Sequence, residues 1–278
     1  MSEELEVRNA SPRLRPYVER CWGYHERTAA PTRRREPAST GVVVILGLDA
    51  GLRLVDRNDP ARPSRRLRSF VAGLDDGCAV IEHDGEMHGV QVDLTPLAAR
   101  MVFGVPMHEL AHEAVALDDV LGSDGRRLEE RVAGAQPWEE RFAMVESALG
   151  TRLAAADPPP PDVAWAWQRL RSTHGSLRVS ELAAELGCSR KHLAVRFRDH
   201  VGVPPKLAAR VFRFRRAFDL LGSPTTPSIA EVAAASGYYD QAHLDRDFRD
   251  FAGMTPSALI AEARTAVTFV QDDASRAA

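Results

Sequence analysis

The chain has 278 residues, which is long enough for two domains that each bury a core of their own. It contains no run of 18 apolar residues and no apolar segment near its start, which argues against a transmembrane helix and a secretory signal, so we expect a cytoplasmic protein without membrane contact. Its three cysteines form no Cys-x-x-Cys pair, which argues against a disulfide framework and a cysteine-built zinc site.

The net charge of −3 hides an uneven distribution along the chain. Residues 163–265 carry 15 Lys and Arg against 10 Asp and Glu, whereas residues 1–162 are acidic overall. A basic C-terminal part on an acidic protein indicates a polyanionic partner for that part alone.

The first half of the chain predicts strands followed by helices. GVVVILGL at residues 41–48 has the β-branched content of a buried strand, LRLVD at residues 52–56 alternates, and residues 79–94 predict two strands joined at the turn Asp84-Gly85. Helical spacing follows at Leu97 to Phe103, Arg126 to Ala133 and Trp138 to Leu153. We therefore expect an α+β domain, with a β-rich core followed by helices, over residues 1–155.

Between these strands and helices lies H-E-L-A-H, at residues 108–112. On a helix, His108 and His112 would share one face and could bind zinc, with Glu109 as the general base of a metallopeptidase. Pro106 precedes the motif closely, and the flanking residues leave room only for a short helix. No obvious third ligand follows the motif, and the candidates, by distance along the chain only, are Glu129, Glu130, Glu139 and Glu140. We expect both histidines to lie on the surface of a loop-helix connection and expect no metal site, with a zinc peptidase as the alternative function.

The clearest boundary is AAADPPPPD at residues 154–162, because four consecutive prolines cannot continue a helix. It predicts a proline-rich linker over residues 156–162 and a second, all-α domain over residues 163–265. The last residues, 266–278, are expected to form a disordered tail.

The second domain contains an internal repeat. Ser180 to Pro205 is echoed by Ala230 to Pro256, and the second copy has one extra residue in its turn. Each copy has a short helix, a glycine, a polar residue that can cap the next helix, and then H-L-x-x-x-F-R-D. Glycine suits the end of a helix, and Ser or Asp suits the start of the next, so the repeat predicts two helix-turn-helix units.

The second helix of each unit has an outward face with the chemistry of a major-groove reader. At 100° per residue, Leu193 with Phe197 and Leu244 with Phe248 face the core. The outward positions hold Arg, which suits guanine, Gln, which suits adenine, Lys, which suits phosphate, or small apolar groups, which suit the thymine methyl group. On the helix between the units, Arg213 is a candidate for phosphate contact, whereas Asp245, Asp247 and Asp250 would repel phosphate if they lay near it.

Residues 163–260 resemble the DNA-binding domain of AraC/XylS-type transcriptional regulators. The resemblance rests on LAAELGCSRKHLAVRF, GVPPKLAARVFRFRRAFDLL and IAEVAAASGYYDQAHLDRDFRDFAGMTPS, and more weakly on SPRLRPYVERCWGY upstream. It implies two helix-turn-helix units, joined by a long helix, that enter successive major grooves. By this likeness the base-reading residues are Arg190, Lys191, Ala194, Val195, Arg198, Gln241, Ala242, His243 and Arg246, and the phosphate contacts are Lys206, Arg213 and Arg249.

We therefore expect a sequence-specific regulator of transcription that binds double-stranded DNA, needs no cofactor and is not an enzyme. Its N-terminal domain would sense a small molecule of unknown identity or mediate dimerisation; a domain that only contacts other proteins, RNA polymerase among them, fits the sequence equally. An alkyl-transfer repair enzyme fused to an AraC-like module would need a cysteine cluster, which this chain lacks.

Overall fold

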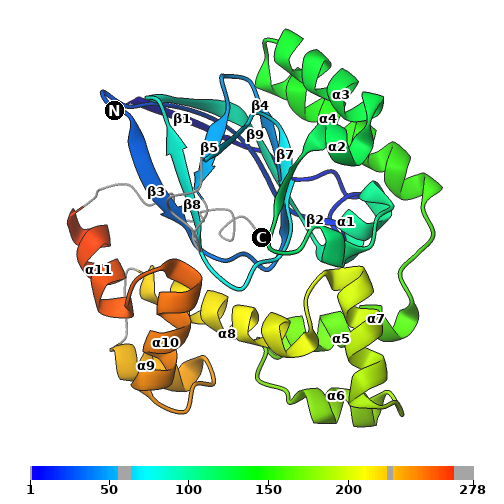
Figure 1. Cartoon of the computed structure of the whole chain (residues 1–278), viewed down its shortest axis with the longest axis vertical. Coiled ribbons are helices and arrows are strands. Elements are labelled where there is room, and N and C mark those ends of the chain that lie inside the picture. The colour runs from blue at the N-terminus through cyan, green and yellow to red at the C-terminus, as the bar shows by residue number, and fades with distance from the viewer. Residues whose placement is uncertain (1, 56–63, 224–227, 266–278) are drawn as a thin grey trace.

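A computed structural model describes residues 2–55, 64–223 and 228–265. The strands and the first helices form one part of the molecule, and the later helices form a second part below it (Figure 1). The predicted α+β domain followed by an all-α domain is thereby confirmed.

The N-terminal part is built on two antiparallel sheets. The larger has the order β1-β2-β9-β4-β7-β10, with strands Ser2–Val7, Val18–Arg27, Glu86–Leu94, Val42–Gly47, Phe70–Ala72 and Ala114–Ala116. The smaller has the order β3-β8-β5-β6, with strands Thr32–Glu36, Ala79–His83, Leu52–Val55 and Arg65–Leu67. Apolar side chains from both sheets, including Ile45, Phe70 and Ile81, form one buried cluster.

The strands predicted from the sequence are β4, β5, β8 and β9, and the turn at Asp84-Gly85 joins the last two. Asp56, the end of the predicted LRLVD strand, lies outside the described residues. The helices of this part are α1 (Pro96–Phe103), α2 (Leu117–Leu121), α3 (Ser123–Gly134) and α4 (Trp138–Ala155). Of these, α1, α3 and α4 contain the three predicted helical segments.

The chain is helical after the prolines. The helices are α5 (Pro161–Ser172), α6 (Val179–Glu185), α7 (Arg190–Val201), α8 (Pro205–Leu221), α9 (Ile229–Ala235), α10 (Gln241–Ala252) and α11 (Pro256–Thr265). The repeat corresponds to α6–α7 and α9–α10, and α8 runs between the two units (Figure 1). The predicted tail at residues 266–278 lies outside the described residues. No helix in the described ranges combines the length and the apolar character needed to cross a membrane.

The two parts of the molecule share a hydrophobic core. Helix α1 and the short 3-10 helix η1 (Met107–Glu109) pack against α7, and one cluster of buried residues runs from the sheet through these elements. Met107 is 1% exposed, and its carbonyl oxygen lies against Gly202 at the end of α7. The region of the H-E-L-A-H motif is therefore the contact between the N-terminal part and the first helix-turn-helix unit.

Candidate nucleic-acid interface

The first helix-turn-helix unit consists of α6, a turn and α7. Gly187 ends the first helix with φ +63°, a conformation that glycine adopts at little cost. The Ser189 hydroxyl then caps α7 by accepting a hydrogen bond from the His192 N–H at 3.1 Å. Leu193 and Phe197 are buried, so the opposite face of α7 is turned to solvent.

Of the five predicted base-reading residues of α7, three lie on this outward face, Ala194 lies at its flank and Arg190 begins the helix. Arg190, Lys191, Val195 and Arg198 are exposed, and Ala194 is half-buried. Val195 has 64% of its surface exposed although it is apolar. A thymine methyl group would give this side chain the apolar partner that it lacks in the free protein.

The second unit is built in the same way from α9 and α10. Gly237 has φ +78°, and the Asp240 carboxylate caps α10 by accepting from the His243 N–H at 2.8 Å. Leu244 and Phe248 are fully buried against α8. The periodicity of the repeat therefore predicted the inward faces of both second helices correctly.

On α10 the four predicted base-reading positions are also accessible. Gln241, Ala242 and Arg246 are exposed, whereas His243 is half-buried and its ring meets Tyr238 edge-on at 5.0 Å. These residues lie in the first two turns of the helix, the part that reaches base edges when a recognition helix enters the major groove.

The three predicted phosphate contacts are placed differently from one another. Lys206 at the start of α8 and Arg249 near the end of α10 are exposed. Arg213 is instead half-buried, and its Nη1 donates to the Gly175 carbonyl oxygen at 2.7 Å while the guanidinium lies 6.0 Å from the Tyr238 ring centre. Arg213 therefore links the turn after α5 to the second unit, and this internal contact occupies part of its guanidinium.

Two acidic residues of α10 are paired with one arginine of α8. Asp247 is 1% exposed and accepts from Arg210 Nε and Nη2 at 3.1 and 2.6 Å, and Asp250 accepts from the same guanidinium at 2.7 Å. Burial acts to lower the pKa of Arg210, but the hydrogen bonds to the two carboxylates outweigh it and raise that pKa. Both carboxylates are therefore paired inside the unit, and their repulsion of phosphate stays a prediction. The half-buried Asp245 lies 4.0 Å from Arg249.

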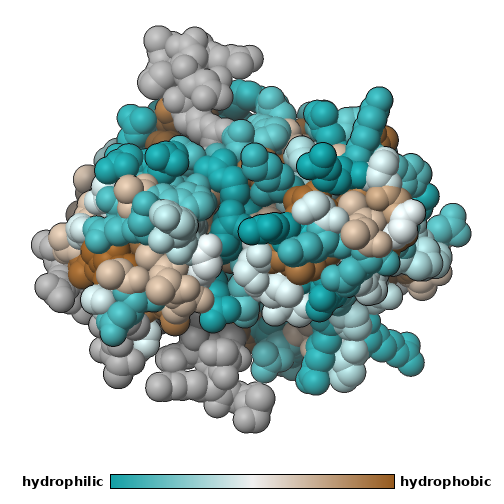
Figure 2. Space-filling view, turned by 90° about the horizontal axis from the view of Figure 1, so that it is seen from below, coloured by the Kyte–Doolittle hydropathy of each residue, from teal (hydrophilic) through white to brown (hydrophobic). Residues whose placement is uncertain are grey.

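Both recognition helices point their C-terminal ends at the N-terminal part. Beside the contact of Gly202 with Met107, the Ala38 N–H donates to the Phe251 carbonyl at 2.8 Å, and the Cys78 N–H donates to the Asp250 carbonyl at 3.2 Å. The predicted base-reading residues lie in the opposite, N-terminal halves of α7 and α10, except Arg198, which lies in the last turn of α7. Seen from the side of the C-terminal helices, the surface is mostly hydrophilic with a few apolar patches (Figure 2).

The H-E-L-A-H motif does not have the geometry of a zinc peptidase. Only residues 107–109 form a helical turn, and it is of the 3-10 type, while His112 has φ +63°. His108 and His112 therefore do not share a helix face. Both are exposed, as the sequence analysis expected, and His108 Nδ1 lies 4.0 Å from the Asp199 carboxylate of α7.

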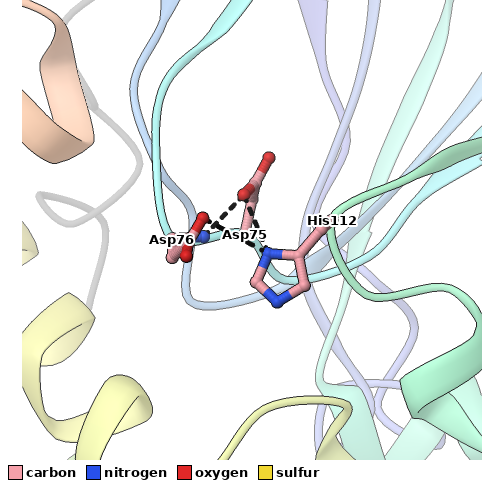
Figure 3. Close-up of side chains that lie close together, drawn as sticks. All are labelled: Asp75, Asp76 and His112. Carbon is pink, nitrogen blue, oxygen red and sulfur yellow. Dashed lines mark hydrogen bonds and ion pairs between the residues drawn. The ribbon is translucent and has the colours of Figure 1, made fainter. Parts of the chain in front are cut away.

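His112 belongs instead to a small polar group at the base of the larger sheet (Figure 3). Its Nδ1 lies 3.1 Å from Asp75 Oδ1 and 3.4 Å from Asp76 Oδ1. These three residues offer ligand atoms that all lie within 4.8 Å of one another, a spacing that a metal ion could bridge, and neither His108 nor Glu109 belongs to the group. The arrangement in the structure is that of an imidazole paired with two carboxylates.

Tyr239 is an accessible residue that the sequence analysis did not single out. It is 94% exposed and immediately precedes Asp240, the cap of the second recognition helix. It is also the extra residue that lengthens the second turn relative to the first. That insertion was visible in the aligned repeats and was the signal that could have identified it.

Comparisons with known proteins agree with this geometry. Residues 182–262 match a family described as a helix-turn-helix domain, and residues 7–116 match a family described as a domain of unknown function (DUF6597). The chain is 28% identical over 152 residues to the HTH-type transcriptional regulator GlxA of Rhizobium meliloti (strain 1021), an alignment covering 45% of this chain and 47% of GlxA. The chain thus spans about half the length of the curated relative that it matches.

Solved structures of ToxT from Vibrio cholerae have a similar fold. The alignment with an apo form of a ToxT variant covers 91% of this chain and 99% of the ToxT chain, with a TM-score of 0.51 and 11% identity. The alignment with ToxT carrying a bound unsaturated fatty acid covers 91% of this chain and 96% of that ToxT chain, with a TM-score of 0.50 and 10% identity. The C-terminal part of this chain therefore contains a helix-turn-helix domain, and it follows a β-rich N-terminal part in a fold similar to that of ToxT.

Proposed function

We propose that this chain is a transcriptional regulator that binds specific sequences of double-stranded DNA through a domain spanning residues 163–265. The observation that carries the proposal is the pair of capped recognition helices whose outward faces hold exposed arginine, lysine and glutamine. The excess of basic residues in this part of the chain supports attraction to the phosphate backbone.

The side chains suggest how each unit would recognise bases. Arginine forks onto the O6 and N7 atoms of guanine, glutamine pairs with adenine, and small apolar groups meet the thymine methyl group. We assign base contacts to Arg190, Lys191, Ala194, Val195, Arg198, Gln241, Ala242, His243 and Arg246. Lys206 and Arg249 are assigned to phosphate, and Arg213 has at most a shared role there because it also binds the Gly175 carbonyl.

We further propose that residues 1–155 form a domain that controls DNA binding in response to a small molecule, with residues 156–162 as the linker. Support comes from the contacts that this part makes with the C-terminal ends of both recognition helices. A ligand that favours one arrangement of these contacts would shift the population of DNA-competent molecules. The fold relative ToxT is known with an unsaturated fatty acid bound, which supports looking for an organic effector.

A regulator of this kind would act in the cytoplasm of a bacterium, without catalysis, cofactor or metal. RNA polymerase and a second copy of the chain are the further partners that it would use. The two recognition helices would enter successive major grooves of one duplex, about one helical turn apart.

The test is selection of duplexes bound by the purified full chain from a random pool, followed by titration of the enriched sequence. We expect one enriched site with two conserved segments about 10 base pairs apart, bound at least 1000-fold more tightly than a scrambled duplex at physiological salt. Equal affinity for the enriched and scrambled duplexes would show that the protein does not read sequence.

A further inference from the structure

Helix α8 packs against both helix-turn-helix units (Figure 1), but the buried residues of the two units form two separate clusters. Ala208 and Phe212 of α8 belong to the cluster of the first unit, whereas Val211 and Phe214 belong to that of the second. Leu207, which is only partly buried, packs against both clusters. Units with separate cores can tilt against each other unless a further contact connects them.

A loop at residues 173–176, directly after α5, lies against α8 on the side of the first unit. Gly175 has φ +72°, and a Cβ on it would collide with the Ala209 carbonyl group of α8. The Gly175 N–H donates to the Leu170 carbonyl oxygen at 2.8 Å, and the Ser176 N–H donates to the Thr173 carbonyl oxygen at 3.0 Å. These backbone hydrogen bonds hold the loop to the end of α5, which itself packs against α7.

Arg213 of α8 connects this loop to the turn of the second unit. Its Nη1 donates to the Gly175 carbonyl oxygen at 2.7 Å, and its guanidinium carbon lies 6.0 Å from the Tyr238 ring centre, at the outer limit of a cation–π contact. The turn also approaches the stem of this side chain, since a Cβ on Gly237 would lie 3.6 Å from Arg213 Cδ and 3.7 Å from Ser176 Cβ. The loop of the first unit and the turn of the second therefore meet at one half-buried arginine.

This contact continues to the start of the second recognition helix. Tyr238 is 6% exposed, and its ring meets the His243 ring edge-on at 5.0 Å. The His243 N–H in turn donates to the Asp240 carboxylate that caps α10. A displacement of Tyr238 would therefore move the first turn of α10, because packed side chains transmit displacement.

We propose that Arg213 is a positioning residue that fixes the placement of the second helix-turn-helix unit relative to the first. That this placement decides which spacing of two DNA segments the protein accepts rests on the proposed function. A change of one base pair in the spacing rotates one segment against the other by about 34° and shifts it by about 3.4 Å. Two units in a fixed placement discriminate against such a change, whereas two units that tilt freely tolerate it.

The first experiment measures the placement in the full chain without DNA. Spin labels at Ala184→Cys on α6 and Ala234→Cys on α9, exposed positions that match in the repeat, give a distance distribution by double electron–electron resonance. Cys188→Ala removes the native thiol that is not buried. We expect one narrow distance in this parent, and a distribution about twofold broader or more in Arg213→Met, which keeps the apolar stem but has no donor. Arg213→Lys retains a charged donor and should restore part of the narrow distribution.

Further variants separate this contact from general damage to the fold. Arg215→Met is the matched control on the same helix, because Arg215 pairs with Asp219 of α8 at 3.2 Å, and it should leave the distribution unchanged. Tyr238→Leu removes the ring from the other side of the contact and should broaden the distribution as Arg213→Met does, so that failure of one variant to fold leaves the other. Tyr238→Phe keeps the ring and should not broaden it. A parent-like distribution in a variant of Arg213 or Tyr238→Leu that retains the thermal transition would overturn the positioning role.

The second experiment measures discrimination between spacings. Its probes are the duplex selected with the parent chain and two versions of it, one base pair longer or shorter between the two segments. We expect the parent to bind both altered duplexes at least about tenfold more weakly, and Arg213→Met to bind them less than about threefold more weakly than the selected duplex. An equal loss on all three duplexes for Arg213→Met, with a salt slope lowered by about one, would make Arg213 a phosphate contact and overturn its link to spacing.

Together the two experiments distinguish failure of this inference from failure of the proposed function. A parent chain that selects no duplex, with a broadened distribution in Arg213→Met, would overturn the proposed function and leave the positioning role standing. Sequence-specific binding by the parent, with an unchanged distribution in the folded variants, would overturn the positioning role alone. Broadening without any loss of discrimination between spacings would overturn the link to DNA.

Discussion

The two helix-turn-helix units have closely related sequences but are packed against different parts of the molecule. In the first unit, Leu193, Phe197 and Val201 belong to a hydrophobic cluster that continues into the N-terminal part. In the second unit, Leu244 and Phe248 belong to a separate cluster around α8, to which the N-terminal part contributes Ala38. The first unit is therefore joined to the N-terminal part by core packing, whereas the second has a core of its own.

This difference affects how each unit can respond to a change in the N-terminal part. A displaced α1 or η1 would move α7 directly, because packed side chains transmit displacement. The second unit is fastened by backbone hydrogen bonds from Ala38 and Cys78 to the end of α10, and internally by Arg210. We expect the first unit to be the more sensitive to the N-terminal part and the second to be more autonomous.

The largest effect should come from removing Arg210, because the second unit depends on it for its buried charge. Arg210→Ala would leave the Asp247 carboxylate, which is 1% exposed, without its cation. Breaking a buried ion pair from one side costs about 3–5 kcal/mol of unfolding free energy. Hydrogen exchange followed by mass spectrometry should show loss of protection in α9 and α10, with much smaller changes in α6 and α7.

A double variant separates the lost charge from the lost packing. Arg210→Met with Asp247→Leu removes both charges and should recover most of the stability, since apolar pairs often replace buried ion pairs without loss. Arg169→Ala is the control, because Arg169 pairs with Glu185 at 3.5 Å on an exposed surface. Equal loss of protection in both units after Arg210→Ala would show that the two units unfold together.

The next largest effect on stability should come from replacing one of two glycines at matching positions of the repeat. Gly202 has φ +97°, and a Cβ there would lie 2.9 Å from the Met107 carbonyl oxygen, a backbone atom. Gly253 has φ +68°, and its Cβ would meet side-chain atoms of Cys78 and Arg35 that can move. We expect Gly202→Ala to cost about 2–3 kcal/mol and Gly253→Ala about 1 kcal/mol in urea unfolding.

Gly187→Ala provides the control for backbone strain alone, because its Cβ would meet nothing within 4 Å at φ +63°. If Gly202→Ala costs no more than Gly187→Ala, the first unit is not tightly packed against Met107. The inference that the first unit packs more tightly against the N-terminal part than the second unit does would then be wrong.

Much of the architecture could be predicted from local sequence, and the parts that could not depend on distant pairing. Strands β4, β8 and β9 are apolar enough to be recognised by themselves. Strand β2, with the sequence VERCWGYHER, carries charged residues near both of its ends, and its main partner β9 lies far along the chain. Nothing local in its sequence indicates that pairing.

The same distinction applies to the candidate site. Helical periodicity and the repeat predicted which faces of α7 and α10 are exposed. Periodicity also places Asp247 beside Leu244 and Phe248 on the buried face, a signal that the sequence analysis did not use. Its partner Arg210 is 37 positions away in the sequence, and Arg213 is 38 positions away from its partner Gly175. Neither pairing could be derived without the fold.

Base reading by the two units can be compared through one arginine in each. Arg246→Ala and Arg198→Ala should each cost about 1–3 kcal/mol on the selected site and much less on a scrambled duplex, if each arginine contacts a guanine. If the second unit is the more autonomous, adding an effector should change the cost of Arg198→Ala more than that of Arg246→Ala. The measurement is a titration of both duplexes with each variant. An arginine whose loss weakens both duplexes equally is a backbone anchor.

Tyr239 offers a smaller test, confined to the second unit. Its ring is 94% exposed beside the start of α10, and the first turn has no counterpart to it. We expect Tyr239→Ala to weaken binding about three- to tenfold on all duplexes alike, through a hydroxyl contact to phosphate. Tyr239→Phe should reproduce the loss if the hydroxyl is responsible. An unchanged affinity for Tyr239→Ala would show that the extra residue only lengthens the turn.

The smallest effects on DNA affinity should come from losing single phosphate contacts. One such contact next to the first unit can be compared with one on the second unit. Lys206 begins α8 directly after the first unit, and Arg249 lies near the end of α10; both are exposed. Replacing either by Ala should weaken binding to all sequences and lower the slope of log affinity against log salt by about one, because one counterion fewer is released.

Arg249 differs from Lys206 because it lies 4.0 Å from Asp245, which partly offsets its positive charge in the free protein. The change in slope should therefore be smaller for Arg249→Ala than for Lys206→Ala. The double variant Arg249→Ala with Asp245→Ala should restore part of the affinity lost in Arg249→Ala. A larger change in slope for Arg249→Ala would place the stronger phosphate contact on the second unit, which would then anchor the protein on DNA while the first unit responds to the N-terminal part.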